Sequence, residues 1–374
     1  MMDLKYILEQ LFPYIVALYL LDCVTYVRRY HLLFVSNFGN AFRLQKSGLR
    51  MVGLLPSDRA FLCHSLPIFF TSQRLYFTAD KNRPEFEVYK EEDFDHILYD
   101  DIKTVAAEGK LLKINGDVVC DTPSGKTADR LARFVRDLTG QPQSKRADRI
   151  KAFLAEGADL QKINALQTDN SRLVFCLKVL SCLLFACFFI VLPLALYAGL
   201  YVYLDVFFLL IFMALIYIMI PIIAFFAYRN IYKGETGKTG AILPAVLSPV
   251  SAMHVLRSLT TEIYARFDFL AVAKVLMPLK DFRVLMRREL FRINYAKTEV
   301  GNGGLQEFLC LKEESYHRML AGSGITLQEI LAAPQKQEDD ADSYCPLCGT
   351  EYLTGPNSCY DCRISLKKFD RTTI

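Results

Sequence analysis

Four cysteines near the C-terminal end have a type and spacing suited to metal chemistry. Cys345 and Cys348 form one CxxC pair, and after ten intervening residues Cys359 and Cys362 form a second. Two residues between thiolates allow both sulfurs to reach one tetrahedral ion, and Gly349 permits the tight turn behind the first pair. The spacing therefore predicts that four sulfurs bind a single metal ion.

This stretch resembles a four-cysteine zinc ribbon with rubredoxin-like knuckles. The resemblance implies a structural Zn²⁺ ion, because four protein ligands leave no open coordination position. Iron is the subsidiary alternative, since a tetrahedron of sulfurs accepts both ions. A redox dithiol is the competing interpretation, although two CxxC pairs at this spacing favour a metal. Arg363 stands where a symmetric pattern would have a second glycine.

The predicted ribbon, residues 344–370, is too small to fold without help. About thirty residues cannot bury enough apolar area, so the metal must contribute to the folding free energy. Residues 335–343 (QKQEDDADS) before it are polar and acidic. We therefore expect the ribbon to follow a plain acidic linker.

Residues that could form a catalytic site are hard to find elsewhere. His254 and His317 lie in predicted helices without other ligands at metal-binding spacing. Two GKT sequences lack the first glycine of a phosphate-binding loop, because Cys120 and Tyr232 occupy that position. We predict that the chain is not an enzyme, and a membrane enzyme with an unrecognised site is the alternative.

The bulk composition limits the class of partner and the compartment. The net charge of +4 is too small to indicate a nucleic-acid partner. Seven of the eleven cysteines lie outside the CxxC pairs, either scattered singly or within an apolar run. Scattered thiols together with CxxC pairs are typical of a reducing compartment rather than a disulfide scaffold.

The middle of the chain is almost purely apolar. The 26 residues 179–204 and the 23 residues 206–228 carry no formal charge, and Asp205 separates the two runs. About 20 apolar residues suffice to cross the hydrocarbon layer, so each run is long enough. We predict a transmembrane helical hairpin at residues 173–228, with its turn at the aromatic residues before Asp205.

Basic residues predict the orientation of this hairpin. Arg172 and Lys178 precede the first run, and Arg229, Lys233 and Lys238 follow the second, whereas the turn contains no Lys or Arg. By the positive-inside rule both ends of the hairpin face the cytoplasm. We therefore expect a multi-pass protein of the plasma (inner) membrane whose soluble regions are cytoplasmic.

A third apolar segment, residues 11–27, contains Asp22 and is followed by Arg28 and Arg29. No small-residue cleavage site follows it, which argues against a cleaved signal peptide. Two alternatives remain: a short spanning helix with an outside N-terminus, or an interfacial amphipathic helix. Either one makes residues 1–29 a membrane anchor.

Residues 30–140 change to short strand-like stretches. Asn115-Gly116 is the strongest hairpin signal, and residues 127–138 predict one amphipathic helix. The other expected strands are 32–35, 69–70, 74–78, 86–89, 111–114 and 117–120. The stretches TSQRLYFT, ILYDDIKTV and GKLLKING, with the helix after them, resemble bacterial pleckstrin-homology-like domains over residues 32–138. The resemblance implies a β-barrel closed by a helix, and a binding module; some other small α+β domain is the alternative.

After the hairpin, residues 229–334 predict a helical region. A helix from Asp281 to Asn294 has one apolar face and one face dominated by Arg283, Arg287, Arg288 and Arg292. Such a face suits either anionic lipid or packing against neighbouring helices, and we favour packing.

The sequence thus predicts a multi-domain α+β membrane protein. Its segments are an anchor (1–29), a cytoplasmic α+β domain (30–140), a helical connector (141–172), the hairpin (173–228), a helical region (229–334), the linker (335–343) and the ribbon (344–370). We expect a scaffold or accessory protein that presents these modules to membrane or cytoplasmic proteins. A subunit of a transport or envelope-biogenesis complex is the alternative, and homo-oligomerisation remains open.

Overall fold

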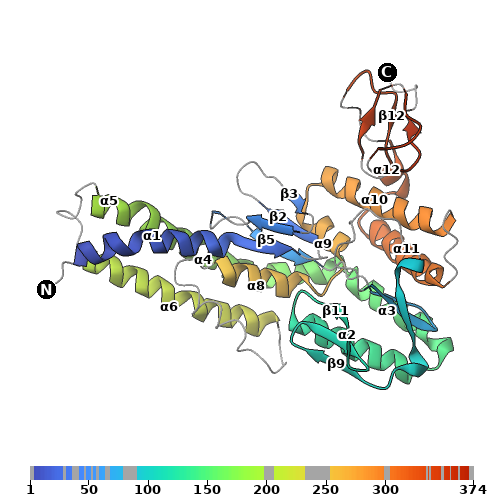
Figure 1. Cartoon of the computed structure of the whole chain (residues 1–374), viewed down its shortest axis with the longest axis horizontal. Coiled ribbons are helices and arrows are strands. Elements are labelled where there is room, and N and C mark those ends of the chain that lie inside the picture. Colours follow the sequence, from blue (N-terminus) through green and yellow to red (C-terminus); the bar gives the residue numbers. More distant parts are fainter. Residues whose placement is uncertain are drawn as a thin grey trace. The chain divides into compact units, whose positions relative to one another are not determined.

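The fold combines long apolar helices with small antiparallel sheets (Figure 1). The structure is a computed structural model that describes residues 4–27, 31–35, 42–45, 48–51, 54–55, 59–63, 68–78, 91–197, 206–231, 253–298, 304–333, 336, 338–346, 349–353, 355–360 and 363–369. The chain divides into two compact units. Unit 1 comprises Met1–Cys63 and Gln161–Arg266, and unit 2 comprises His64–Leu160 and Phe267–Ile374.

Three helices of unit 1 are long and apolar enough to cross a membrane. They are α1 (Leu4–Cys23), α4 (Leu160–Ala186) with its continuation, and α6 (Val206–Ile231). A π-helical turn, Cys187–Val191, connects α4 to α5 (Leu192–Tyr197) immediately before Pro193. A proline cannot donate to the carbonyl four residues earlier, and the widened turn accommodates this loss. The two apolar runs predicted from the sequence are therefore helical, whereas the turn at 198–205 lies outside the described residues.

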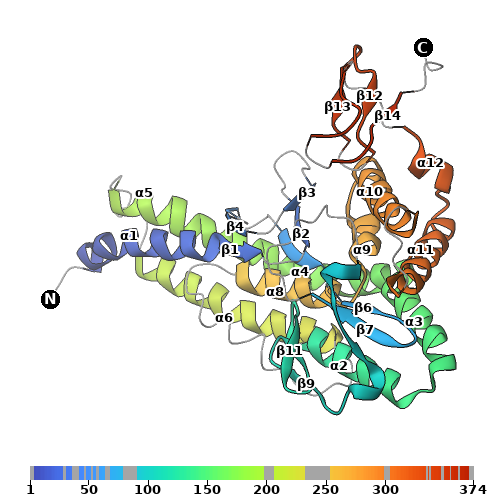
Figure 2. The same ribbon diagram turned by 45° about the vertical axis from the view of Figure 1, so that its right-hand side comes forward.

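Helix α1 packs antiparallel to the α4–α5 rod. The ring of Tyr19 lies 5.6 Å from that of Phe185 and 4.8 Å from that of Phe189, and Phe12 lies 6.2 Å from Tyr197. Figures 1 and 2 show α1, the rod and α6 running side by side. Large apolar side chains of all three helices remain exposed, such as Tyr14. Hydrocarbon solvates such a surface without the cost that water imposes.

The apolar segment 11–27 is divided between a helix and a strand. Helix α1 ends at Cys23, and β1 (Val24–Val27) pairs antiparallel with β4 (Gly48–Met51). The sequence Val-Thr-Tyr-Val consists of β-branched and aromatic residues, which favour a strand. The helix therefore begins earlier and ends earlier than the apolar segment.

The sheets do not close into a barrel within the described residues. Three separate sheets have the strand orders β3–β2–β5, β6–β7–β8 and β9–β10–β11. The strands are β2 (His31–Val35), β3 (Phe42–Gln45), β5 (Arg59–Cys63), β6 (Ile68–Phe70), β7 (Arg74–Phe77), β8 (Asp95–Leu98), β9 (Val105–Glu108), β10 (Leu111–Ile114) and β11 (Asp117–Asp121). Helix α8 (Met253–Tyr264) packs on β5, and α2 (Gly125–Gly140) packs on β9 and β10. Helices, rather than an opposite barrel wall, cover these sheets, so the barrel implied by the pleckstrin-homology-like resemblance is not observed there.

The Asn115-Gly116 turn signal was an accurate predictor in this region. Asn115 and Gly116 both have positive φ, 53° and 92°, and join β10 to β11 as a tight hairpin. Helix α2 begins after Ser124, whose hydroxyl accepts a hydrogen bond from the Thr127 N–H. Five of the six expected strands are observed, and the stretch 86–89 lies outside the described residues.

Two carboxylates fix the N-terminus of α11 (Leu305–Gly322) in unit 2. Glu91 accepts hydrogen bonds from the Tyr76 hydroxyl (2.6 Å) and the Gly304 N–H (3.0 Å). Glu307, in the first turn, accepts from the N–H and hydroxyl of Ser72 at 2.9–3.1 Å. Negative charge is favourable at this end of a helix. Burial alone would raise the pKa of Glu91, but these hydrogen bonds hold it below its usual value.

We predict that Glu91→Gln destabilises the chain at neutral pH by about 1 kcal/mol. Because the folded-state pKa of Glu91 is depressed, its contribution is present above the unfolded value of 4.5 and is lost as the pH falls through the folded value. Thermal unfolding of both chains in detergent, at pH 7 and at pH 3.5, measures the stability that Glu91 contributes. The difference from the native chain should be smaller at pH 3.5 than at pH 7. Asp117→Asn, an exposed carboxylate at the start of β11, is the control and should change neither melt. A loss that persists unchanged at pH 3.5 contradicts the prediction.

A charge pair ties α8 to the end of α1 in unit 1. The Arg257 guanidinium donates to the backbone carbonyl of Asp22 at 3.5 Å and is attracted by the Asp22 carboxylate. Burial lowers the pKa of Arg257, and Asp22 opposes that effect. The Asp22 carboxylate, which interrupts the apolar segment 11–27, therefore interacts with a residue of α8, and α8 follows α6 in the sequence.

We predict that Asp22→Asn lowers the free energy of unfolding by about 1–3 kcal/mol, because it leaves a partly buried guanidinium without its counter-charge. Unfolding of the detergent-solubilised chain measures the loss. Gln10→Ala, at an exposed position of the same helix, is the matched control. Equal stability of the Asp22 and Gln10 variants would show that the pair does not hold α1.

Candidate metal centre

The C-terminal module has a frame of three very short strands. Strand β12 (Ser343–Tyr344) pairs with both β13 (Glu351–Tyr352) and β14 (Lys367–Lys368). The segment before it is also bonded into the frame, because the Asp342 N–H donates to the Tyr352 carbonyl and the Phe369 N–H donates to the Asp342 carbonyl, both at 3.0 Å. The end of the acidic segment 335–343 therefore belongs to the folded module.

The two CxxC turns have the same backbone hydrogen bonds. The Cys345 N–H donates to the Thr350 carbonyl (2.9 Å), and the Gly349 N–H donates to the Cys345 carbonyl (2.8 Å). In the second turn the Cys359 N–H donates to the Ile364 carbonyl (2.8 Å), and the Arg363 N–H donates to the Cys359 carbonyl (2.9 Å). The bonded positions have identical offsets from the first cysteine of each pair, so the two turns are related copies of one knuckle.

Arg363 departs from the expected glycine in type but not in conformation. Its φ is 54°, and Gly349 at the equivalent position of the first knuckle has a φ of 76°. The left-handed region costs a residue with a Cβ atom about 1–2 kcal/mol. The second knuckle adopts its turn despite this cost.

The first sulfur of each pair is held in one buried cluster. Cys345 and Cys359 are 0% and 1% exposed and pack with Ile364. The Tyr352 hydroxyl donates to Cys359 Sγ at 3.2 Å and accepts from the Tyr360 N–H at 3.2 Å. A donor aimed at a buried sulfur suits a thiolate, which is the form that binds a metal.

The other two predicted ligands, Cys348 and Cys362, lie outside the described residues. Among the residues that are described, no three His, Cys, Asp or Glu side chains gather closely enough to hold an ion. The structure thus places Cys345 and Cys359 in one buried cluster, and the four-thiolate site stays a prediction. Zn²⁺ remains the predicted ion.

The basic face of α10 (Leu279–Thr298) is used within the chain. Arg283 pairs with Glu329, and the Arg287 Nε donates to the Ile330 carbonyl at 2.8 Å. Both partners belong to α12 (Leu327–Leu331), and Arg292 bonds Glu289 on its own helix at 3.0 Å. Three of the four arginines of the predicted basic face, Arg283, Arg287 and Arg292, therefore bond to groups of the chain itself rather than to lipid.

The sequence patterns did not predict a cluster of buried charged side chains in unit 2. Asp268 caps α9 (Phe269–Leu276) by accepting from the Leu270 N–H (2.9 Å), and it also accepts from the Tyr316 hydroxyl (3.1 Å). Glu289 accepts from Lys312 at 2.7 Å. Burial raises the pKa of Asp268, although Lys312 attracts its charge. The cap could have been found from an Asp directly before an apolar run, whereas the partners are distant in sequence.

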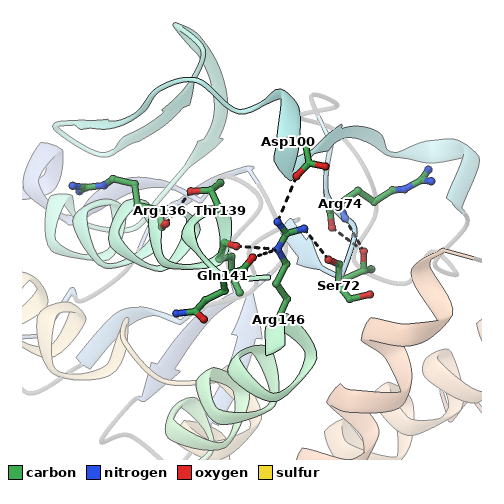
Figure 3. A network of polar contacts seen from close by, with 9 residues as sticks. Ser72, Arg74, Asp100, Arg136, Thr139, Gln141 and Arg146 are labelled. Carbon is green, nitrogen blue, oxygen red and sulfur yellow. Dashed lines mark hydrogen bonds and ion pairs between the residues drawn. The ribbon is translucent and has the colours of Figure 1, made fainter. Parts of the chain in front are cut away.

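Arg146 of α3 (Gln143–Gly157) forms a second such junction (Figure 3). Its guanidinium donates to the carbonyls of Leu138 and Gln141 at 3.0 Å, and of Ser72 at 3.2 Å. It also lies over the Tyr99 ring, 4.8 Å from the centroid. Carbonyls at the C-terminal end of α2 need donors, and this arginine supplies them. Its role is therefore to join α2, α3 and the β6–β7 turn.

We predict that Tyr352→Phe weakens zinc binding about tenfold, because removal of a group that bonds a metal ligand typically costs 10–100-fold in affinity. Competition with a chromophoric chelator measures the constant. Tyr360→Phe is the matched control, since it removes a hydroxyl from a 77% exposed side chain and keeps both the ring beside Tyr352 and the backbone N–H contact. Identical zinc affinities in the two variants would show that the Tyr352 hydroxyl does not contribute to metal binding.

Comparisons with known proteins leave these geometric observations to carry the functional argument. No protein family, curated protein or solved structure matches the chain.

Proposed function

We propose that the chain is a non-enzymatic scaffold or accessory protein of the inner membrane, with a zinc ribbon that contacts partner proteins on the cytoplasmic side. The observation that carries the proposal is the presence, in one chain, of three helices able to span a bilayer and a separate compact unit that includes the ribbon. The proposal does not depend on a β-barrel in residues 32–138.

The composition of unit 2 supports a hairpin whose ends lie on one side. The unit combines residues from before and after the hairpin, for example through the Gly157 carbonyl and the Asp268 N–H, which are 2.8 Å apart. Lys151 and Glu314 likewise pair at 2.7 Å. A bilayer cannot divide one folded unit, so the chain crosses it an even number of times between Leu160 and Phe267.

The packing of α1 supports a third span. Because α1 runs antiparallel to the α4–α5 rod, it crosses in the opposite direction to the first helix of the hairpin. With the hairpin ends in the cytoplasm, as the basic residues predict, its N-terminus lies outside and Arg28 and Arg29 lie inside. This arrangement agrees with the spanning alternative and with the positive-inside rule.

The ribbon supplies the surface for a partner. Tyr360 is 77% exposed and Leu353 is 56% exposed. Exposed aromatic and aliphatic side chains on a rigid frame are typical anchors of protein interfaces. The described charged side chains of α10, α11 and α12 are largely used in pairs within the unit, which is typical of a structural module.

The proposal predicts that a photo-crosslinking amino acid at Tyr360 captures a specific protein in intact cells. The same amino acid at Asp117, an exposed position at the start of β11 in the same unit, is the matched control. A supporting result is one protein that crosslinks at Tyr360 and not at Asp117, and that co-purifies with the native chain in detergent. Purification without a stable companion, together with equal crosslinking at both positions, contradicts the scaffold function.

A further inference from the structure

Two aromatic side chains project from α10 on a face that does not belong to the helical core. Phe291 and Tyr295 are one helical turn apart, and their rings stack at 6.0 Å with an interplanar angle of 28°. The core face of the same helix is formed by other side chains, which are fully or almost fully buried: Phe282, Met286, Leu290 and Ile293. The aromatic pair is only partly buried, and it would be an exposed apolar patch without a partner.

The partner of this pair is the metal-binding end of the ribbon. Phe291 and Tyr295 pack against the cluster of Cys345, Cys359 and Ile364. Figures 1 and 2 both show the ribbon strands beside α10. Ile364 belongs to the second knuckle, because its carbonyl accepts from the Cys359 N–H. Every ribbon residue of the buried cluster is thus part of a knuckle.

The surface that contacts α10 therefore exists only when both knuckles are closed. A frame of three two-residue strands cannot close them by its own burial, and a bound metal supplies the missing free energy. We infer that Phe291 and Tyr295 form a docking surface whose occupant is the metal-loaded ribbon, so that metal binding and ribbon docking are one coupled equilibrium. This inference rests on the zinc centre of the proposed function.

Coupling of this kind acts equally in both directions. If docking on the aromatic pair strengthens zinc binding by some factor, zinc must strengthen docking by the same factor. Loss of the metal would then uncover Phe291 and Tyr295 and release the ribbon from α10. The ribbon therefore covers Phe291 and Tyr295 only while it holds a metal ion. A module on a passive linker would not depend on the metal in this way.

The first test measures the affinity of the full-length chain for zinc by chelator competition. Phe291→Ala with Tyr295→Ala should weaken binding about tenfold, as expected for groups that pack on metal ligands. Asn294→Ala, an exposed position between them on the same helix, is the matched control and should bind as the native chain does. Equal affinities in all three chains overturn the inference.

The second test uses the native chain and needs no variant to fold. Hydrogen–deuterium exchange of the peptide spanning residues 287–298 is compared with zinc bound and after chelation. Faster exchange of this peptide after chelation supports the coupling. A return to slow exchange when zinc is added back supports it further. Zinc binding at one ion per chain with unchanged exchange overturns the inference and leaves the zinc centre in place. A chain that binds no zinc overturns both.

Discussion

Water solvates the two long uncharged runs, 179–204 and 206–228, poorly, and this constraint shapes the rest of the chain. Once α4–α5 and α6 are placed in hydrocarbon, every backbone polar group must be bonded within its own helix. A hairpin also returns the chain to its starting side. Residues as far apart as Ser72 and Glu307 fold together in unit 2, which is assembled from segments before and after the two apolar runs.

The features that could be predicted from the sequence depend on neighbours along the chain. The apolar runs and the Asn115-Gly116 hairpin are decided by consecutive residues. The cysteine spacing is also a local signal, because two residues between thiolates restrict their geometry, and the metal site that it indicates stays a prediction. Even the unexpected Arg363 adopts the conformation that the knuckle requires, since the hydrogen bonds around it are set by position rather than by residue type.

The features that could not be predicted depend on partners distant in sequence. Packing was the favoured interpretation of Arg283 and Arg287, but the sequence did not indicate that α12 supplies their partners, Glu329 and the Ile330 carbonyl. A linear division into 141–172 and 229–334 likewise gives no sign that the Asp268 N–H bonds the Gly157 carbonyl. Periodicity shows which face of an element is apolar, but not which element covers it.

The size of the ribbon explains why its attachment to α10 matters. Its strands have two residues each, and one small cluster, Ala341, Tyr344 and Phe369, lies apart from the knuckles. A module with so little buried area depends on covalent or metal crosslinks, or on a neighbour. Here the cysteine cluster also packs on Phe291 and Tyr295, so the neighbour contacts the same residues that the metal would organise. The two sources of stability therefore cannot act independently, because each one requires the knuckles to be closed.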